Sequence, residues 1–311
     1  MNKGKSTPAK DFGRAVGRVI LRILIAIIRV LPLSVGLAIG RGLGKIMLAL
    51  SKKRYNVAIQ NLKIAFGDTI TSAERDRIAR ASFEHFGMFA IEVIKFSTMP
   101  QAEVERRFDA DPEEFAAFEE LMKREKGCIC VTGHLGNFEV AGRWIVPRGY
   151  KVIALAREAR DKGTTKLMMS VRERNGVKVL NLGRSMKPIF AGLKENALIA
   201  IVCDQNAADV FVPFFGQPTG TVDGPAKIAL RAEAPMIFFY CVRQPNGRYK
   251  LQSHGYYDLV STGDAEADVK RGMTEVNNRI EEIIRLYPEQ WLWFHDRWKS
   301  SPDVVVPETT R

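Results

Sequence analysis

A histidine that could act as a base lies in a glycine-rich turn after an apolar run. The run "CICVT" at 128–132 is typical of a buried strand, and His134 follows it between Gly133 and Gly136. An imidazole titrates near neutral pH, so one ring nitrogen can take a proton while the other is held by an acceptor. The glycines allow a tight turn and a close approach of the backbone to a ligand.

A carboxylate follows this histidine after five residues. On one continuous helix, His134 and Glu139 would point about 140° apart, so the pair meets only if His134 lies in the loop before the helix. Glu139 would then accept a hydrogen bond from one imidazole nitrogen and leave the other free. The competing interpretation is a capping histidine, with Asn137 as N-cap and Glu139 favouring the helix N-terminus. The residue types alone leave both readings open.

The elements that must position these residues change character along the chain. Residues 52–100 place apolar side chains at helical intervals, with Thr71 or Ser72 as an expected N-cap before Glu74. From residue 127 onward, short β-rich runs alternate with helical stretches at 161–175, 185–196, 223–233 and 264–287. This pattern predicts an α/β fold with a mostly parallel central sheet flanked by helices. The run "YKLQSHGYYDLV" is expected to be an antiparallel edge strand.

Ligands of open α/β sheets bind beyond the carboxyl ends of the strands, which singles out three more polar residues. Asp204 follows "LIAIVC" directly, Arg157 follows "VIALA", and Arg174 lies near a helix end before the next strand. Guanidinium groups suit phosphate or phosphopantetheine, since they make bidentate contacts with phosphate oxygens. The alternative for both arginines is a surface salt bridge. Asp204 lies at the carboxyl end of its strand, on the edge where a ligand could bind.

The N-terminal section has the pattern of a helix that lies at a membrane surface. Residues 12–50 are apolar but interrupted by arginines, and no stretch reaches the roughly 18–20 uncharged residues of a plain span. Arg14, Arg18, Arg22 and Arg29 fall within about 80° of a helical wheel, next to a wide apolar face. Pro32 separates this helix from a second apolar one. A helix pair packed on the domain and a cleaved signal are the competing interpretations.

The net charge indicates the kind of binding partner, and the cysteine spacing indicates whether a zinc site is expected. The formal net charge of +12, with a pI near 9.6, favours an anionic partner. No nucleic-acid-binding motif is present, so we expect no nucleic-acid partner. The four cysteines form no paired CxxC units, which favours buried thiols in a reducing compartment over a zinc site. We expect neither a metal nor a cofactor.

Several motifs together resemble one enzyme family. "TGHLGNFE" resembles the His-x4-Asp/Glu motif of glycerolipid-type acyltransferases, and its wording is closest to the bacterial lipid A biosynthesis acyltransferases (lauroyl/myristoyl type) of the lysophospholipid acyltransferase superfamily. Further matches lie in the expected order, from about residue 15 to 300. They are "YNVAIQNLKIAFG" (55–67), "CDQN" (203–206), "VFVPFFGQPTGTVDGPAKIALRAEAP" (210–235) and "YPEQWLWFHDRWK" (287–299).

The resemblance implies a glycerolipid-acyltransferase-like fold and roles for particular residues. His134 would be the general base on an acceptor hydroxyl, and Glu139 would orient it. Arg157, Arg174, Asp204, Gly136 and Asn137 would bind substrate, while backbone N–H groups near 133–136 are candidates for the oxyanion. Residues 1–50 would be a polar tail and membrane-associated helices, and 51–311 the acyltransferase domain, with a helical lead-in at 51–126 and the α/β core at 127–300.

The same resemblance implies the reaction and its location. The acyl donor would be acyl carrier protein or acyl-CoA, and the acceptor a membrane glycolipid, first of all a lipid A precursor. A lysophospholipid, an ornithine lipid or a phosphoinositide mannoside is the alternative acceptor, and a non-catalytic basic membrane-binding protein is the alternative class. The enzyme would work at the bacterial inner membrane, with its catalytic domain facing the cytoplasm and the basic charge meeting anionic headgroups.

Overall fold

The computed structural model describes residues 23–156, 162–181 and 185–302. Residues 23–30 are helical and precede the named helices. In chain order these are α2 (Leu33–Leu50), α3 (Lys52–Phe66), α4 (Ser72–Phe96), α5 (Gln101–Arg107), α6 (Pro112–Met122), α7 (Phe138–Ile145), α8 (Lys162–Arg174), α9 (Lys187–Lys194), α10 (Gly224–Ala232) and α11 (Ala265–Leu286). The strands are β1 (Phe108–Ala110), β2 (Cys128–Thr132), β3 (Val152–Ala156), β4 (Lys178–Asn181), β5 (Leu198–Val202), β6 (Val210–Phe214), β7 (Gln217–Thr221), β8 (Met236–Arg243) and β9 (Tyr249–Tyr257).

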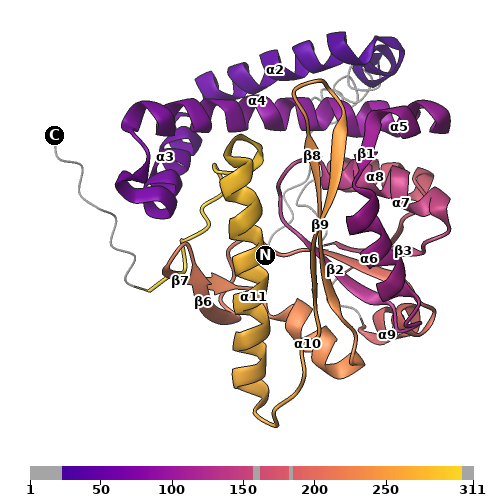
Figure 1. Ribbon diagram of the computed structural model, residues 1–311. Coiled ribbons are helices and arrows are strands. Elements are labelled where there is room, and N and C mark those ends of the chain that lie inside the picture. The colour runs from indigo at the N-terminus through magenta and orange to yellow at the C-terminus, as the bar shows by residue number, and fades with distance from the viewer. Residues whose placement is uncertain (1–22, 157–161, 182–184, 303–311) are drawn as a thin grey trace, which may run out of the picture.

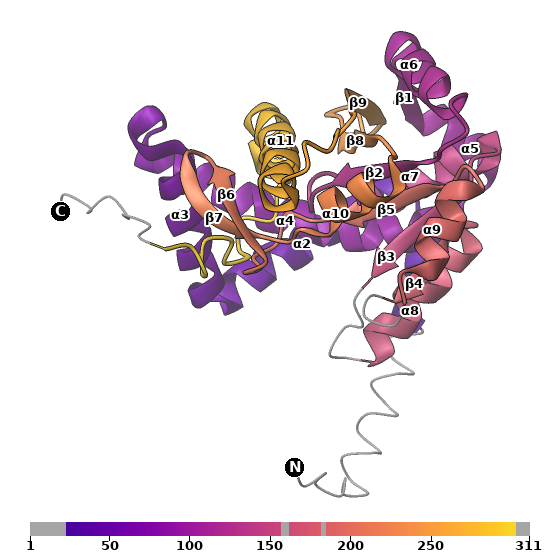
Figure 2. The same ribbon diagram turned by 90° about the horizontal axis from the view of Figure 1, so that it is seen from below.

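Seven strands form a central sheet in the order β1-β9-β8-β2-β5-β3-β4. Every neighbouring pair is parallel except β8 with β9, so the predicted α/β fold with a mostly parallel sheet is confirmed. The expected edge position of β9 is wrong, because the three-residue strand β1 pairs along its outer side. The β6–β7 hairpin forms a separate two-stranded sheet beside α11 (Figure 2).

The central strand β2 is buried on both faces and divides the core in two. Ile129 and Val131 pack with α9, α10 and α11, whereas Cys128 and Cys130 pack with α5, α6 and α7. Alternate side chains of a strand point to opposite faces, so a continuously apolar run fits a strand covered on both sides. All four cysteines are buried and free.

Helices α2 and α4 lie side by side across the top of the molecule in Figure 1. The buried residues along α2 are mostly glycines, at positions 36, 40 and 44, and they face α4 near Gly87. Small residues at such a seam let two helix backbones approach closely. The N-cap of α4 is Thr71, as predicted, since its hydroxyl accepts a hydrogen bond from the Glu74 N–H. The other face of α2 exposes Val35, Ile39, Leu43, Ile46 and Leu50.

The glycine seam makes a testable contribution to stability. A Cβ at Gly40 would lie 2.7 Å from the Cα of Met88, whereas a Cβ at Gly42 meets nothing within 4 Å. We expect Gly40→Ala to destabilise the protein by about 1–3 kcal/mol, because the helix backbones must move apart. Gly42→Ala should instead be neutral or stabilising by up to about 1 kcal/mol, through helix propensity. Thermal unfolding followed by circular dichroism in one detergent compares the two variants; equal Tm shifts would contradict the seam.

Candidate active site

His134 and Asp204 meet at the carboxyl ends of two neighbouring strands. β2 and β5 are parallel and in register, with Thr132 opposite Val202, so the residues after them share one edge of the sheet. The His134 Nδ1 atom lies 2.6 Å from Asp204 Oδ1. The backbone N–H of His134 also donates to Asp204 Oδ2, at 2.7 Å. The turn and the carboxylate are therefore joined by two contacts.

The Asp204 carboxylate is buried but well supplied with donors. Trp291 Nε1 donates to its Oδ2 atom at 2.7 Å, in addition to the two contacts from His134. Burial alone would raise the pKa of Asp204, but the charge and hydrogen bonds of His134 and the Trp291 hydrogen bond outweigh it and hold the pKa at about 2. Asp204 is thus an ionised acceptor at neutral pH.

An ionised Asp204 fixes the state of the histidine ring. A carboxylate only accepts hydrogen bonds, so His134 Nδ1 must carry the proton, and in the neutral ring Nε2 keeps its lone pair. His134 Nε2 lies 3.4 Å from the side-chain nitrogen of Gln205, and the His134 side chain is 22% exposed. Nε2 is therefore on the partly exposed side of the ring, where its one described neighbour is the side chain of Gln205.

Glu139 does not contact the histidine, contrary to the expected hydrogen bond. Its carboxylate pairs with Arg172 of α8, at 2.5 and 3.0 Å, and is almost fully buried. His134 does lie in the loop before α7, as the sequence suggested, but Phe138 is the residue of α7 that faces it, with ring centroids 5.4 Å apart. The next residue of a helix points about 100° away, which turns Glu139 toward α8.

Gly136 and Asn137 hold the turn from inside and do not face an open site. Gly136 has a φ of +60°, and its N–H donates to the carbonyl of Gln290. A side chain at Gly136 would collide with the carbonyl of Cys241. Asn137 is completely buried; it caps α7, as predicted, by accepting from Val140 N–H. The amide of Asn137 is enclosed by protein and donates to Glu92, and its expected substrate contact stays a prediction.

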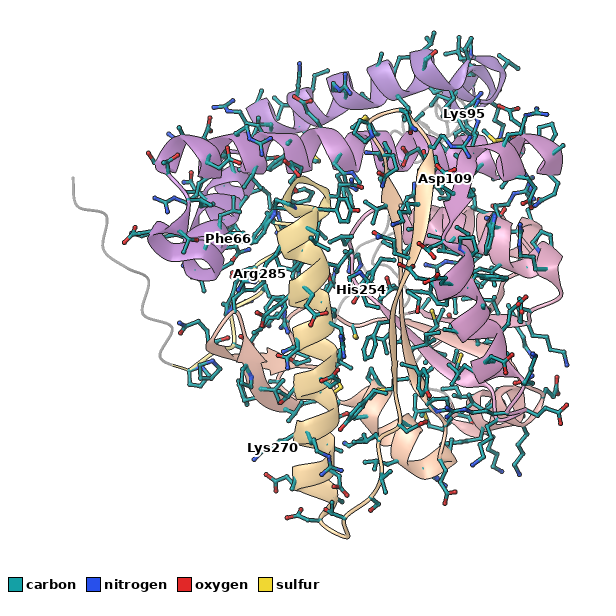
Figure 3. All side chains as sticks on the ribbon, viewed as in Figure 1. Phe66, Lys95, Asp109, His254, Lys270 and Arg285 are labelled. Carbon is teal, nitrogen blue, oxygen red and sulfur yellow. The ribbon has the colours of Figure 1, made fainter. Side chains whose placement is uncertain are left out.

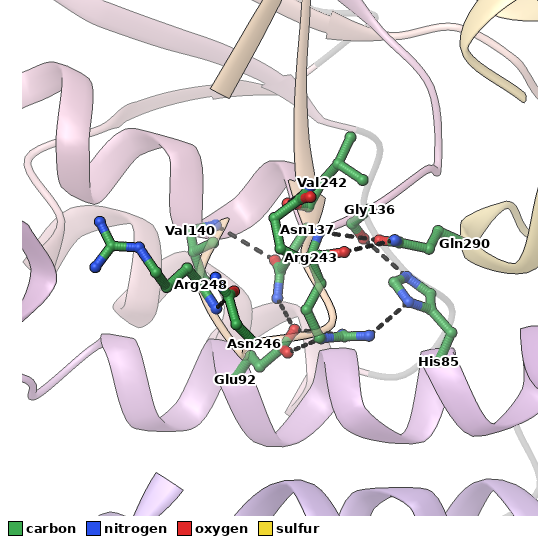
Figure 4. Close-up of polar contacts among 11 residues, drawn as sticks. His85, Glu92, Gly136, Asn137, Val140, Val242, Arg243, Asn246, Arg248 and Gln290 are labelled. Carbon is green, nitrogen blue, oxygen red and sulfur yellow. Dashed lines mark hydrogen bonds and ion pairs between the residues drawn. The ribbon is translucent and has the colours of Figure 1, made fainter. Parts of the chain in front are cut away.

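A buried polar network ties this turn to α4 (Figure 4). His85 Nε2 donates to the carbonyl of Gly136 at 3.0 Å, and Asn137 Nδ2 donates to Glu92 at 2.6 Å. Arg243, at the end of β8, forms an ion pair with Glu92 and donates to His85 Nδ1 at 2.8 Å. Burial and the Arg243 charge lower the pKa of His85 well below its usual value, so His85 is neutral and structural.

The predicted arginine positions are only partly described. Arg157 lies outside the described residues, and Arg174 is exposed at the end of α8. Arg172 is the arginine that pairs with Glu139 of α7. The sequence analysis did not identify Arg172 as a candidate residue. Two of the candidate oxyanion donors are already used, since the N–H groups of His134 and Gly136 donate to Asp204 and Gln290.

An apolar cavity of about 90 Å³ lies next to the Glu139–Arg172 pair. It is bounded by strands of the central sheet and by α7, and Thr132, whose hydroxyl is buried without a hydrogen-bond partner, faces it. Among its lining residues are Phe138, Ile145, Ala154, Val202 and Phe239. Within the described parts of the chain, no group of three or more His, Cys, Asp or Glu side chains is placed to hold a metal ion.

Comparisons with known proteins identify the family to which this chain belongs. Residues 8–300 match the family described as "Bacterial lipid A biosynthesis acyltransferase". The phosphatidylinositol mannoside acyltransferase of Mycobacterium tuberculosis (strain CDC 1551 / Oshkosh) is 25% identical over 233 residues, which cover 73% of this chain and 72% of the relative.

Two relatives from Escherichia coli (strain K12) align over more of the chain. The lipid A biosynthesis lauroyltransferase is 24% identical over 282 residues, 88% of this chain and 89% of the relative. The lipid A biosynthesis palmitoleoyltransferase is also 24% identical over 282 residues, 88% of this chain and 87% of the relative. The chain therefore belongs to the bacterial lipid A biosynthesis acyltransferase family, and it is an acyltransferase that acts on a lipid acceptor.

Proposed function

We propose that this enzyme transfers a fatty acyl chain from an acyl thioester, carried by acyl carrier protein or CoA, to a hydroxyl of a lipid A precursor. The observation that carries the proposal is the His134–Asp204 pair, in which a buried carboxylate holds Nδ1 while Nε2 faces the exposed side chain of Gln205. This is the arrangement of a general base with its orienting group. The nucleophile is then the hydroxyl of the acceptor, and no covalent acyl-enzyme is formed.

The reaction follows from the state of the histidine. His134 Nε2 takes the proton of the acceptor hydroxyl as its oxygen attacks the thioester carbonyl. The charge of Asp204 stabilises the imidazolium that results. When the tetrahedral intermediate collapses, the C–S bond breaks, an ester remains on the acceptor, and the imidazolium can return its proton to the leaving thiolate. Asp204 thus takes the orienting role that the motif alone suggested for Glu139.

Glu139 and Arg172 have a different part in the proposal. Arg172 is the cation nearest to the apolar cavity, and Glu139 fixes the plane of its guanidinium. A guanidinium held in this way suits a phosphate or carbonyl oxygen of the bound substrates, while the apolar lining suits a segment of acyl chain. Arg157 and Arg174 remain candidates for the phosphates of donor or acceptor.

We place the enzyme on the inner membrane with α2 in the interface. Of the described helices, α2 alone is long and apolar enough to cross a bilayer. Its glycine face, however, lies along α4, which carries Asp76, Arg77 and Arg80 on its surface. If α2 spanned the bilayer, those charges of α4 would lie in the hydrocarbon region. A position of α2 parallel to the membrane surface therefore has a much lower free-energy cost than a spanning one. The net charge of +12 favours the same anionic surface.

The base assignment predicts a large loss of chemistry in two variants. We expect His134→Ala and Asp204→Asn each to lower kcat by about 10²–10⁴-fold, the usual contribution of a general base. In Asp204→Asn, either the amide NH₂ faces the donors of Trp291 and His134, or it faces Nδ1 and forces the proton onto Nε2. Acyl transfer from acyl carrier protein in mixed micelles, with Tm as the folding control, measures the loss. Full activity of folded His134→Ala would exclude the base role.

The revised role of Glu139 is tested separately. Glu139→Gln keeps the shape of the side chain but removes the charge that holds Arg172. We expect a smaller fall in kcat than in Asp204→Asn, together with a raised KM for the donor or acceptor. The exposed Glu173→Gln is the matched control for the loss of one negative charge near the site. If Glu139→Gln lowered kcat as much as Asp204→Asn with KM unchanged, the orienting role would belong to Glu139 after all.

The acceptor is tested by lipid analysis. In a deletion strain, mass spectrometry should find lipid A that lacks one secondary acyl chain, and the plasmid-borne wild-type gene should restore it. Plasmid-borne His134→Ala should not. Unchanged lipid A together with a missing acyl chain on another glycolipid would redirect the acceptor, and the similarity to a phosphatidylinositol mannoside acyltransferase makes mannosylated phosphoinositides the first class to check.

A further inference from the structure

A basic cavity lies at the C-terminal end of α4. It has a volume of about 610 Å³ and is formed by three parts of the chain. These are the turn between the helical residues 23–30 and α2, the ends of α4 and α5, and the tip of the β8–β9 hairpin at Asn246 and Gly247. Figure 3 shows Lys95 in this corner of the molecule, beside the beginning of α2.

Three cations line the cavity, and only one of them has a carboxylate partner. Arg107 pairs with Glu103 at 2.7 Å. The Lys95 ammonium donates to the carbonyls of Arg29 and Leu31, which closes the preceding helical turn, and it has no carboxylate within ion-pair distance among the described residues. Arg29 has no hydrogen-bond or ion-pair partner among the described residues, and its Nε atom is buried. Burial lowers the pKa of Lys95, the charge of Glu103 opposes this shift, and the charge of Arg107 adds to it.

The backbone adds to the positive potential. α2 begins at this cavity with Leu33 and Ser34, and its N-terminus has no side-chain cap. The free N–H groups of an 18-residue helix end favour an anion there. A smaller hollow of about 300 Å³ continues past Arg107 to Arg106 and Arg248. Of these two, Arg248 is neutralised by Asp109, whereas Arg106 is exposed.

An exposed apolar helical segment leads into the cavity. Val30 lines the cavity and is 82% exposed, and Ile23, Leu24 and Ile27 of the same segment are exposed as well. A free phosphate ion would make no contact with the exposed aliphatic side chains. An acidic protein surface would not enter a concave site of this size. A phospholipid meets both features at once, with its phosphate among the cations and its acyl chains beside the exposed aliphatic residues.

We propose that this cavity binds the phosphate diester of an anionic glycerophospholipid headgroup, with Arg29, Lys95 and Arg107 as its cations. The inference rests on the proposed attachment of α2 to the membrane interface, and it adds a defined headgroup site to that attachment. Such a site fixes the rotation of α2 about its axis, because the cavity and the apolar row of α2 must meet the membrane together. The lipid here is a structural partner, distinct from the acceptor at His134.

The test uses the full-length protein in a non-ionic detergent with soluble short-chain lipids. Dihexanoylphosphatidylglycerol should raise Tm in a saturable manner, whereas dihexanoylphosphatidylcholine and inorganic phosphate should not. In the double variant Arg29→Gln/Arg107→Gln we expect the Kd for phosphatidylglycerol to rise about 30-fold, the loss of two cation–phosphate contacts. The matched control is Arg41→Gln/Lys45→Gln, which removes two exposed cations of α2 that pair with Glu84 outside the cavity. Its Kd should stay within about twofold of the wild type.

A second variant covers the case in which the double variant fails to fold. Asn246→Asp places a carboxylate at the cavity and keeps the side-chain oxygen that accepts from Arg248 N–H. It should weaken phosphatidylglycerol binding about tenfold without changing Tm in the absence of lipid. Equal losses in the cavity variants and the α2 control would show general surface attraction and overturn the site. Equal stabilisation by inorganic phosphate would overturn the lipid assignment. Neither readout uses acyl transfer, so failure of the catalytic proposal would be seen independently.

Discussion

The parallel pairing of β2 with β5 is the constraint on which the active site depends. It brings two residues that are 70 positions apart in the sequence to one edge of the sheet, with His134 Nδ1 and Asp204 Oδ1 2.6 Å apart. A buried carboxylate is costly unless donors surround it, and Asp204 receives three, from the His134 ring, the His134 backbone and Trp291. The carboxylate therefore organises the histidine turn and the C-terminal segment at the same time.

A second buried charge system holds the other side of the turn. Glu92 and Arg243 form an ion pair inside the protein, and His85 and Asn137 complete its hydrogen bonds. Removing one member of such a pair typically costs about 3–5 kcal/mol, because the remaining charge stays buried without a partner. The catalytic turn is thus clamped between Asp204 on the sheet side and α4 on the other. His85 is a packed residue of α4, and its packing supports the site.

The elements were predictable from the sequence to the extent that local patterns determine them. The apolar runs gave the buried strands β2, β5 and β8, and the N-cap Thr71 followed from its position before Glu74. The strand β1 was missed because three residues give no periodicity. The β6–β7 hairpin contains Pro213 and Pro218, which argue against strands in any local reading.

The contacts within the site were harder to predict, because they depend on the order of strands. Asp204 was recognised as a residue at a sheet edge, but nothing local says that β5 is the neighbour of β2. Glu139, five residues from the histidine, looked closer than Asp204, and the direction of α7 decided against it. Arg172 could not be predicted for the same reason. Its role depends on the ion pair with Glu139, which requires α8 to pack beside α7.

The clamped turn and the glycine seam together connect His134, the proposed base, to α2, the helix that we propose to lie in the membrane interface. α4 contacts α2 through backbone-to-backbone packing. It contacts the turn through His85 and Glu92, which bond to the Gly136 carbonyl and to the buried side chain of Asn137, so all of these contacts are made by buried groups. With α2 in the interface, this leaves His134 at one fixed depth relative to the lipid surface. An acceptor hydroxyl must then be presented at that depth, which makes the geometry of the glycolipid headgroup, and not the reactivity of its hydroxyls, the natural source of selectivity between acceptors.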